Sequence, residues 1–146
     1  MTFGVASMTA PLREVALRRP GKSIVTAEPS AWNYSEHFDP SKIESEYDRF
    51  VLALENFGVN IHWIKGDDLG NADSVFAYDA SLMTPQGAIL MSPGKEKCRG
   101  EEGLHKSFYI NKEIPIIGQI DAPGTAEAGD TLWLDENTVI IGKGFR

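Results

Sequence analysis

Residues 75–91 read VFAYDASLMTPQGAILM. It holds two short apolar runs, residues 75–78 and 88–91, on either side of the turn-forming residues 85–87. Short apolar runs bounded by Pro and Gly predict two strands joined by a turn. Asp79 follows the first run directly, so we expect its carboxylate at the end of an apolar strand.

The clearest predicted helix has start signals at Asp39, Pro40 and Ser41 and ends at Gly58. Ser41 and Glu44 fit a capping box, and Gly58 supplies a stop signal at the C-terminal end. Between them, apolar side chains recur every three or four residues and form one stripe. The stripe contains Ile43, Tyr47, Phe50, Val51, Leu54 and Phe57.

The other predicted elements are a half-buried strand over residues 14–18 with Arg18 nearer water, a strand over 59–64, a helix over 96–111, a strand over 115–120, and a hairpin of 131–134 with 138–141. Strands and helices are mixed without the regular alternation of a doubly wound sheet. The pattern therefore predicts an α/β fold, and a length of 146 residues predicts a single domain over residues 1–146.

Composition narrows the class of protein. With 42% hydrophobic and 24% charged residues the chain is typical of a soluble globular protein. A net charge of −7 argues against a nucleic-acid partner, which requires a basic face. No apolar run reaches the roughly 20 residues of a membrane span. Cys98 is the single cysteine, so a disulfide within the chain is excluded and a cytoplasmic location is expected.

Several kinds of catalytic site are not indicated. The three His and one Cys lack the spacing of a metal site, and no phosphate loop or other cofactor motif is present, so neither metal nor cofactor is expected. On one helix, Cys98 and His105 would be separated by about 10.5 Å of rise. A nucleophile and its base must approach within about 3 Å, so this pair is rejected.

Three acidic residues are of greater interest. Asp79 lies next to one predicted strand, and Glu127 and Asp130 precede another. Carboxylates at strand ends are well placed to hold a cationic ligand through bidentate hydrogen bonds. From spacing alone the alternative is an ordinary turn, since Asp and Gly beside a strand commonly form one.

Two stretches that contain these acids resemble the dimethylarginine dimethylaminohydrolase, arginine deiminase and amidinotransferase superfamily of guanidine-modifying enzymes. Residues 76–91, followed by Pro93-Gly94 and Arg99-Gly100-Glu101, resemble the first substrate-binding block of its dimethylarginine dimethylaminohydrolase-like members. Residues 124–130 resemble the second block, usually written EGGD, with Ala128 in place of one Gly. Residues 141–146 resemble the turn that follows it, and residues 11–20 resemble the first strand.

The resemblance implies a fold and a reaction. The superfamily fold is a five-bladed α/β propeller (pentein-like), with short mixed sheets around a channel and helices outside. A Cys thiolate attacks the guanidinium carbon of an arginine-like small molecule, and a His protonates the departing amine. By this resemblance Glu127 is the catalytic carboxylate and Asp79 holds the guanidinium. Asp130 ends the same motif, and Arg146 matches an arginine that binds the substrate carboxylate.

Around Cys98 the chain departs from its relatives. Cys98 stands where hydrolase members often have an arginine for the substrate carboxylate, and Arg99, next to it, is the substrate-binding candidate there. The superfamily nucleophile lies near the C-terminus, so the catalytic His and Cys are expected beyond Arg146. The chain is then the N-terminal portion of a propeller, truncated before those residues and inactive alone.

These observations lead to an expected function with open alternatives. We expect a fragment of a hydrolase that acts on the guanidinium C–N bond of arginine or a methylated arginine. An amidinotransferase, a non-catalytic binding module and one subunit of a split enzyme remain alternatives. A propeller cut partway exposes strand edges, so self-association through them is predicted, chiefly at the strand that ends near Ile141.

Overall fold

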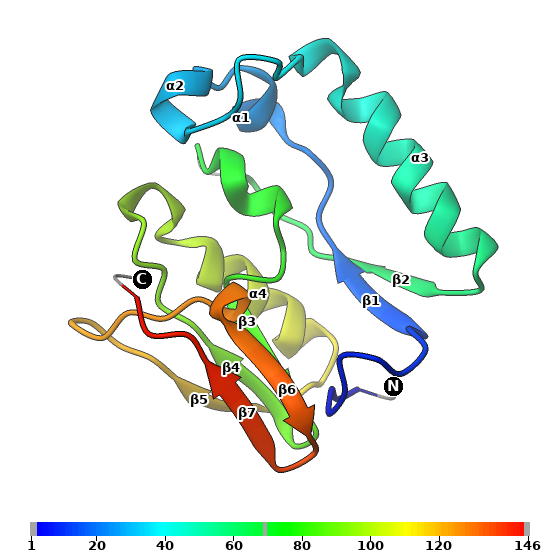
Figure 1. The fold of residues 1–146 in the computed structure, drawn as a ribbon, viewed down its shortest axis with the longest axis vertical. Helices are drawn as coiled ribbons and strands as arrows, with labels where there is room; N and C mark the ends of the chain where they lie inside the picture. The colour runs from blue at the N-terminus through cyan, green and yellow to red at the C-terminus, as the bar shows by residue number, and fades with distance from the viewer. Residues whose placement is uncertain (1–2, 69, 145–146) are drawn as a thin grey trace. The chain divides into compact units, whose positions relative to one another are not determined.

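The computed structural model describes residues 3–68 and 70–144. Its helices and short strands are mixed along the chain, which confirms the predicted α/β class (Figure 1). Backbone contacts cluster in two compact units. Unit 1 comprises Met1–Pro11 and Ala77–Arg146, and unit 2 comprises Leu12–Phe76. The single domain over residues 1–146 stays a prediction.

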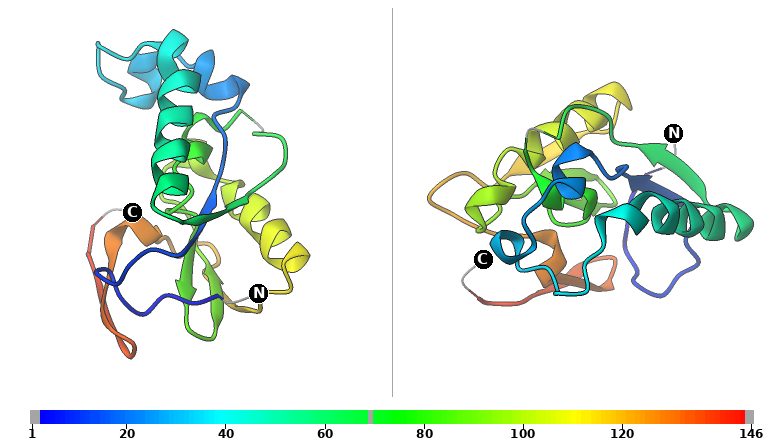
Figure 2. Two further views of the ribbon diagram at one scale, coloured as in Figure 1. Left: turned by 90° about the vertical axis from the view of Figure 1, so that its right-hand side faces the viewer. Right: turned by 90° about the horizontal axis from the view of Figure 1, so that it is seen from above.

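Unit 2 is built on a pair of parallel strands. β1 (Glu14–Leu17) pairs with β2 (Asn60–Trp63), and Glu14 lies opposite Asn60. Parallel strands need a crossover, and α3 (Ile43–Asn56) supplies it and contacts β2 (Figure 2). The smaller elements of this unit are α1 (Lys22–Val25), α2 (Pro29–Trp32) and the 3₁₀ helices Pro40–Lys42 and Ala72–Val75.

Of the predicted start signals, Asp39 caps the 3₁₀ helix Pro40–Lys42 that leads into α3. Its carboxylate accepts hydrogen bonds from the Ser41 backbone N–H (3.1 Å) and hydroxyl (2.6 Å), whereas the capping box of Ser41 does not form. At the other end Gly58 has φ of 74°, a left-handed conformation that suits the predicted stop. Val51 is buried on the inner face of α3, whereas 87% of Phe57 is exposed, so the apolar stripe extends beyond the core.

The prediction that Arg18 lies nearer water is wrong. Arg18 is buried and does not lie near water. Its Nε donates to Ser74 Oγ (3.2 Å), and its Nη1 and Nη2 donate to the carbonyl oxygens of Ile64 (3.4 Å) and Gly66 (3.1 Å). A guanidinium offers five donors in a fixed fork, so it can be buried where several acceptors surround it. Arg18 thereby joins the end of β1 to the loop after β2.

Unit 1 contains a three-stranded sheet in the order β3-β4-β5. β3 (Ser81–Thr84) and β4 (Gly87–Leu90) are antiparallel, and β5 (Ile116–Gln119) is parallel to β4. α4 (Glu101–Asn111) is the crossover between β4 and β5. The predicted helix over 96–111 is interrupted, because Gly100 has φ of 100° and separates the 3₁₀ helix Glu96–Cys98 from α4.

The two faces of this sheet are covered differently (Figure 1). One face contacts α4 through β4 and β5. On the other, Leu82 and Met91 form a core with Ala128, against which Trp133 packs. Trp133 belongs to the predicted hairpin, which is confirmed as β6 (Thr131–Asp135) paired antiparallel with β7 (Thr138–Ile141). A short 3₁₀ helix, Ala128–Asp130, leads into it.

The predicted strand over residues 75–78 is wrong. Residues up to Val75 form the 3₁₀ helix, and the first strand of the sheet begins at Ser81. Turn hydrogen bonds take the place of a ladder here, from Ser74 N to Asn71 O (3.1 Å) and from Phe76 N to Asp73 O (2.8 Å). Asn, Asp and Ser favour such local turns over strands. Asp79 therefore precedes a strand and does not follow one.

The described residues do not form a closed barrel or propeller. Within residues 3–68 and 70–144 the strands make three separate sheets, and none closes on itself. In the same part of the chain, every helix is too short or too polar to cross a membrane.

Candidate functional site

Asp79 and the segment 127–130 are brought together in unit 1. The half-buried Asp79 accepts the Gly129 backbone N–H on Oδ1 (3.1 Å). Its main-chain oxygen accepts the N–H of Ala128 (3.0 Å). Both predicted motifs therefore meet at one place, although about fifty residues separate them in sequence.

Glu127 is buried and held by the chain that follows β4. Its Oε1 accepts the backbone N–H of Gly94 (3.2 Å). Just before it, Ala126 and Ser92 exchange two backbone hydrogen bonds of 2.9 and 3.1 Å. Pro93 and Gly94 belong to the first of the two blocks that resemble the superfamily. Gly94 therefore contacts the Glu127 carboxylate of the second block.

The short 3₁₀ helix fixes the rest of the motif. Asp130 N donates to Glu127 O (3.1 Å), and the Thr131 hydroxyl donates to Ala128 O (2.7 Å). Asp130 is exposed, and its carbonyl accepts the N–H of Gly142 from the chain after β7 (2.8 Å). The motif is thus tied to both ends of the hairpin. Of the predicted acids, Glu127 is buried, Asp79 is half-buried and Asp130 is exposed, and the segment 127–130 brings Asp79 and Glu127 into one region of unit 1.

Of the two predicted arginines, the structure describes Arg99. Arg99 is exposed and follows the 3₁₀ helix Glu96–Cys98, with its N–H bonded to Glu96 O (3.2 Å). Arg146 lies outside the described residues.

Cys98 and His105 lie on different elements. Cys98 is buried in the 3₁₀ helix, while His105 belongs to α4 and contacts Ser81 Oγ through Nδ1 (2.8 Å). Among the residues described, no cluster of three His, Cys, Asp or Glu side chains could hold a metal ion.

The contact between Ser81 and His105 was missed by sequence reasoning, since no strand was expected at Ser81. A serine hydroxyl within reach of an imidazole suggests a nucleophilic pair. Here Ser81 is 6% exposed and His105 is 3% exposed, so a substrate could not reach either group. We therefore assign the contact no catalytic role.

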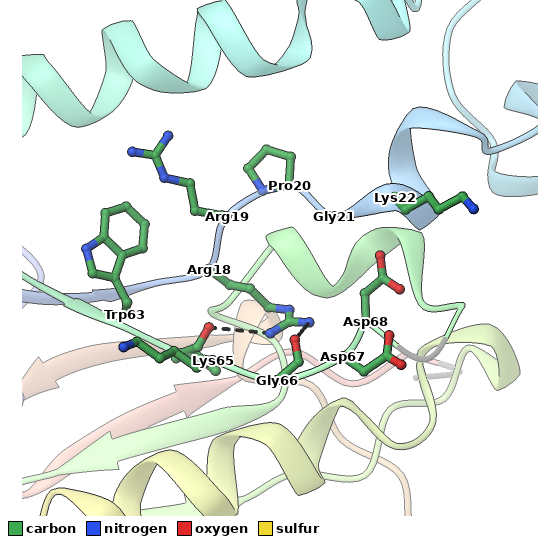
Figure 3. A pocket seen from close by; sticks show the side chains of 11 residues that line it. Arg18, Arg19, Pro20, Gly21, Lys22, Trp63, Lys65, Gly66, Asp67 and Asp68 are labelled. Carbon is green, nitrogen blue, oxygen red and sulfur yellow. Dashed lines mark hydrogen bonds between the residues drawn. The ribbon is translucent and has the colours of Figure 1, made fainter.

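A pocket of about 630 Å³ lies in unit 2, at the carboxyl ends of β1 and β2 (Figure 3). Sequence reasoning did not predict it, and none of the predicted site residues lines it. Arg19 stands over the ring of Trp63 at 4.9 Å and is ion-paired with Asp48. The ammonium groups of Lys22 and Lys65 point away from each other and do not converge on one ligand.

Known proteins resemble most of the chain, including unit 1. No family model matches the chain. N(G),N(G)-dimethylarginine dimethylaminohydrolase of Pseudomonas aeruginosa is 31% identical over 132 residues, which make up 88% of this chain and 49% of that protein. An uncharacterized protein of Aeropyrum pernix is 28% identical over 136 residues, 90% of this chain and 49% of that one.

Solved structures also resemble this chain in fold. A variant of dimethylarginine dimethylaminohydrolase in an adduct with S-methyl-L-thiocitrulline matches with a TM-score of 0.74 and 30% identity, over 93% of this chain and 52% of that one. The chain is similar to dimethylarginine dimethylaminohydrolase in sequence and in fold. The Pseudomonas aeruginosa enzyme complexed with citrulline matches with a TM-score of 0.73 and 28% identity, over 92% and 51%.

The predicted resemblance to guanidine-modifying enzymes is therefore confirmed at the level of dimethylarginine dimethylaminohydrolase-like proteins. The chain spans about half the length of the relatives it matches.

Proposed function

We propose that this chain carries the carboxylate half of a site that binds the guanidino group of arginine or a methylated arginine. The observation that carries the proposal is the junction between Asp79 and the segment 127–130, with Gly129 N–H on Asp79 Oδ1. The dimethylarginine dimethylaminohydrolase structures that it resembles hold citrulline or S-methyl-L-thiocitrulline, both close in shape to arginine.

Each residue has a proposed role. Asp79 holds the guanidinium, which presents planar N–H donors that a carboxylate can accept in pairs. Glu127 is the catalytic carboxylate, and Asp130 completes its motif. Arg146 and Arg99 are proposed to bind the substrate carboxylate at the other end, which would fix the direction in which the ligand lies.

The whole enzyme is proposed to be a hydrolase of the guanidinium C–N bond, with an amidinotransferase as the alternative. The nucleophilic Cys and the His are proposed to come from sequence other than these 146 residues. Residues 1–146 would then be the N-terminal part of a five-bladed α/β propeller in a cytoplasmic protein. Self-association is proposed through the apolar residues that β6 and β7 leave exposed, among them Leu132 and Ile140.

Binding of L-arginine and L-citrulline to the purified chain tests this function by calorimetry or by NMR titration. Asp79→Asn and Glu127→Gln should each weaken arginine binding roughly tenfold or more, because a hydrogen bond to a charged group is worth about 1.5–3 kcal/mol. Asp135→Asn is the matched control, since Asp135 lies at the far end of β6. Equal affinity for arginine in all four proteins would remove the assignment.

A further inference from the structure

A small polar network joins the first residue of β3 to α4. Ser81 Oγ is 2.8 Å from His105 Nδ1 and 2.6 Å from the Tyr109 hydroxyl. All three side chains are buried. His105 and Tyr109 are four residues apart on α4 and therefore project from the same face of the helix.

The number of protons sets the direction of these two hydrogen bonds. Ser81 has one hydroxyl proton, Tyr109 has one, and a neutral imidazole has one N–H and one acceptor nitrogen. If Tyr109 donates to Ser81 and Ser81 donates to His105 Nδ1, both hydroxyl protons are used. In the described part of the chain the Tyr109 hydroxyl contacts no acceptor other than Ser81, so the reverse direction would bury its proton unpaired.

Two physical effects favour the first arrangement. An arrangement that leaves a buried donor without an acceptor is less populated by roughly a factor of five or more. Burial also raises the pKa of the Tyr109 phenol, although its hydrogen bond to Ser81 acts in the opposite sense. The phenol therefore keeps its proton and can act as the first donor. Ser81 then has its own proton to place, and in the proposed relay His105 Nδ1 accepts it, which leaves the imidazole proton on Nε2.

Ser81 is also close to the candidate site along the chain. Asp79 lies two residues before it, and Ala80, between them, is almost fully buried and bonded through its oxygen to Met91 N (3.0 Å). Because only Ala80 separates the two residues, Ser81 cannot shift far without moving Asp79. A displacement of Ser81 against α4 would be passed to Asp79 and to the two backbone N–H groups that Asp79 accepts.

We propose that Ser81 is a positioning residue: the relay from Tyr109 through Ser81 to His105 fixes the start of β3 against α4, and so holds Asp79 where it accepts the N–H groups of Ala128 and Gly129. Its relevance to ligand binding rests on the proposed function, but its existence does not. The relay is a property of the folded chain without ligand.

The tautomer of His105 is the first test. Nitrogen-15 NMR of the imidazole rings distinguishes a protonated Nε2 from a protonated Nδ1, and the exposed His37 serves as the reference within the same protein. We expect a neutral His105 with the proton on Nε2 and Nδ1 as acceptor. A proton on Nδ1 would overturn the relay.

Amide hydrogen exchange is the second test, and it needs no ligand. Ser81→Ala should speed exchange of the Gly129 and Ala128 amides roughly fivefold or more beyond the change in global stability. Leu90→Val is the matched control, because Leu90 pairs with Ser81 across the ladder and is buried on the same face without taking part in the relay. If both variants speed these amides equally at matched stability, Ser81 is merely structural and the proposal is wrong.

Tyr109→Phe keeps the ring and removes only the first donor. If Ser81→Ala does not fold, this variant decides the question, since it should also speed exchange of the Gly129 amide while leaving the proton of His105 on Nε2. An unchanged Gly129 amide would count against the proposal. Failure of wild-type chain to bind arginine would count against the proposed function alone.

Discussion

Gly129 and Asp79 are in such close contact that no side chain fits between them. Besides the 3.1 Å hydrogen bond from Gly129 N to Asp79 Oδ1, a Cβ atom placed on Gly129 would lie 2.2 Å from that same oxygen. This is well inside van der Waals contact. The glycine of this motif is therefore required by the neighbouring carboxylate and not by an unusual backbone conformation.

Gly129→Ala should displace the Asp79 carboxylate and weaken arginine binding. The carboxylate is at the end of a side chain and can rotate away, so the free energy of unfolding should change little. A displaced carboxylate no longer accepts hydrogen bonds from the guanidinium, so arginine affinity should fall roughly tenfold, as estimated for a hydrogen bond to a charged group. Calorimetric titration measures the affinity, and urea unfolding measures the stability.

Gly142→Ala is the control for that experiment. Its Cβ would lie 3.5 Å from Asp130 O, which is ordinary contact, in the same unit of the chain. Unchanged affinity in both variants would show that the Asp79 carboxylate does not contact the ligand.

Asp68 should make the stability of unit 2 sensitive to acid. Burial acts to raise its pKa, but hydrogen bonds from Ser23 and Gly70 and the charge of Arg18 outweigh it, so the pKa lies below its ordinary value of 3.8. A lowered pKa in the folded state means that the stabilisation is complete above the ordinary value and is lost as pH falls through the folded value. Urea unfolding midpoints should therefore decline as the pH falls below about 4.

Asp68→Asn should flatten this decline, because the amide cannot titrate. Asp67→Asn, one residue earlier, removes the same charge next to the same loop and is the matched control. An acid dependence that is identical in wild type and Asp68→Asn would contradict the assignment to Asp68.

The 146-residue chain should release no ureido product from arginine, methylated arginines or agmatine. Cys98 is buried, and His105 lies on another element in contact with Ser81, so the two do not form a nucleophile and base. A colorimetric ureido assay on the purified chain measures this. Activity above background that Cys98→Ser abolishes would require Cys98 to be the nucleophile.

Self-association should depend on the outer face of the β6–β7 hairpin. Leu132 and Ile140 lie opposite each other in register, and both are exposed. Light scattering at several protein concentrations should show a mass that rises with concentration, and Ile140→Lys should reduce the rise by placing a charge in the contact. A clean monomer throughout the range would rule out an association through this face.

The amino-acid sequence was enough to predict the class of fold and the hairpin of β6 and β7. Both depend on local patterns, since apolar periodicity and turn residues act over a few positions. The motif around Glu127 was predicted from its resemblance to the superfamily. The same local reading failed at residues 75–78, where backbone turns take the place of the strand that the apolar run predicted. It also failed at Arg18, whose acceptors Ser74, Ile64 and Gly66 are more than forty residues away.

Only the tertiary structure decided which distant groups meet. It placed Asp79 against Gly129, Glu127 against Gly94, and Ser81 between His105 and Tyr109. No periodicity encodes these contacts. They arise because α4 covers one face of the sheet and the core around Ala128 covers the other, and this packing brings the groups within hydrogen-bond distance.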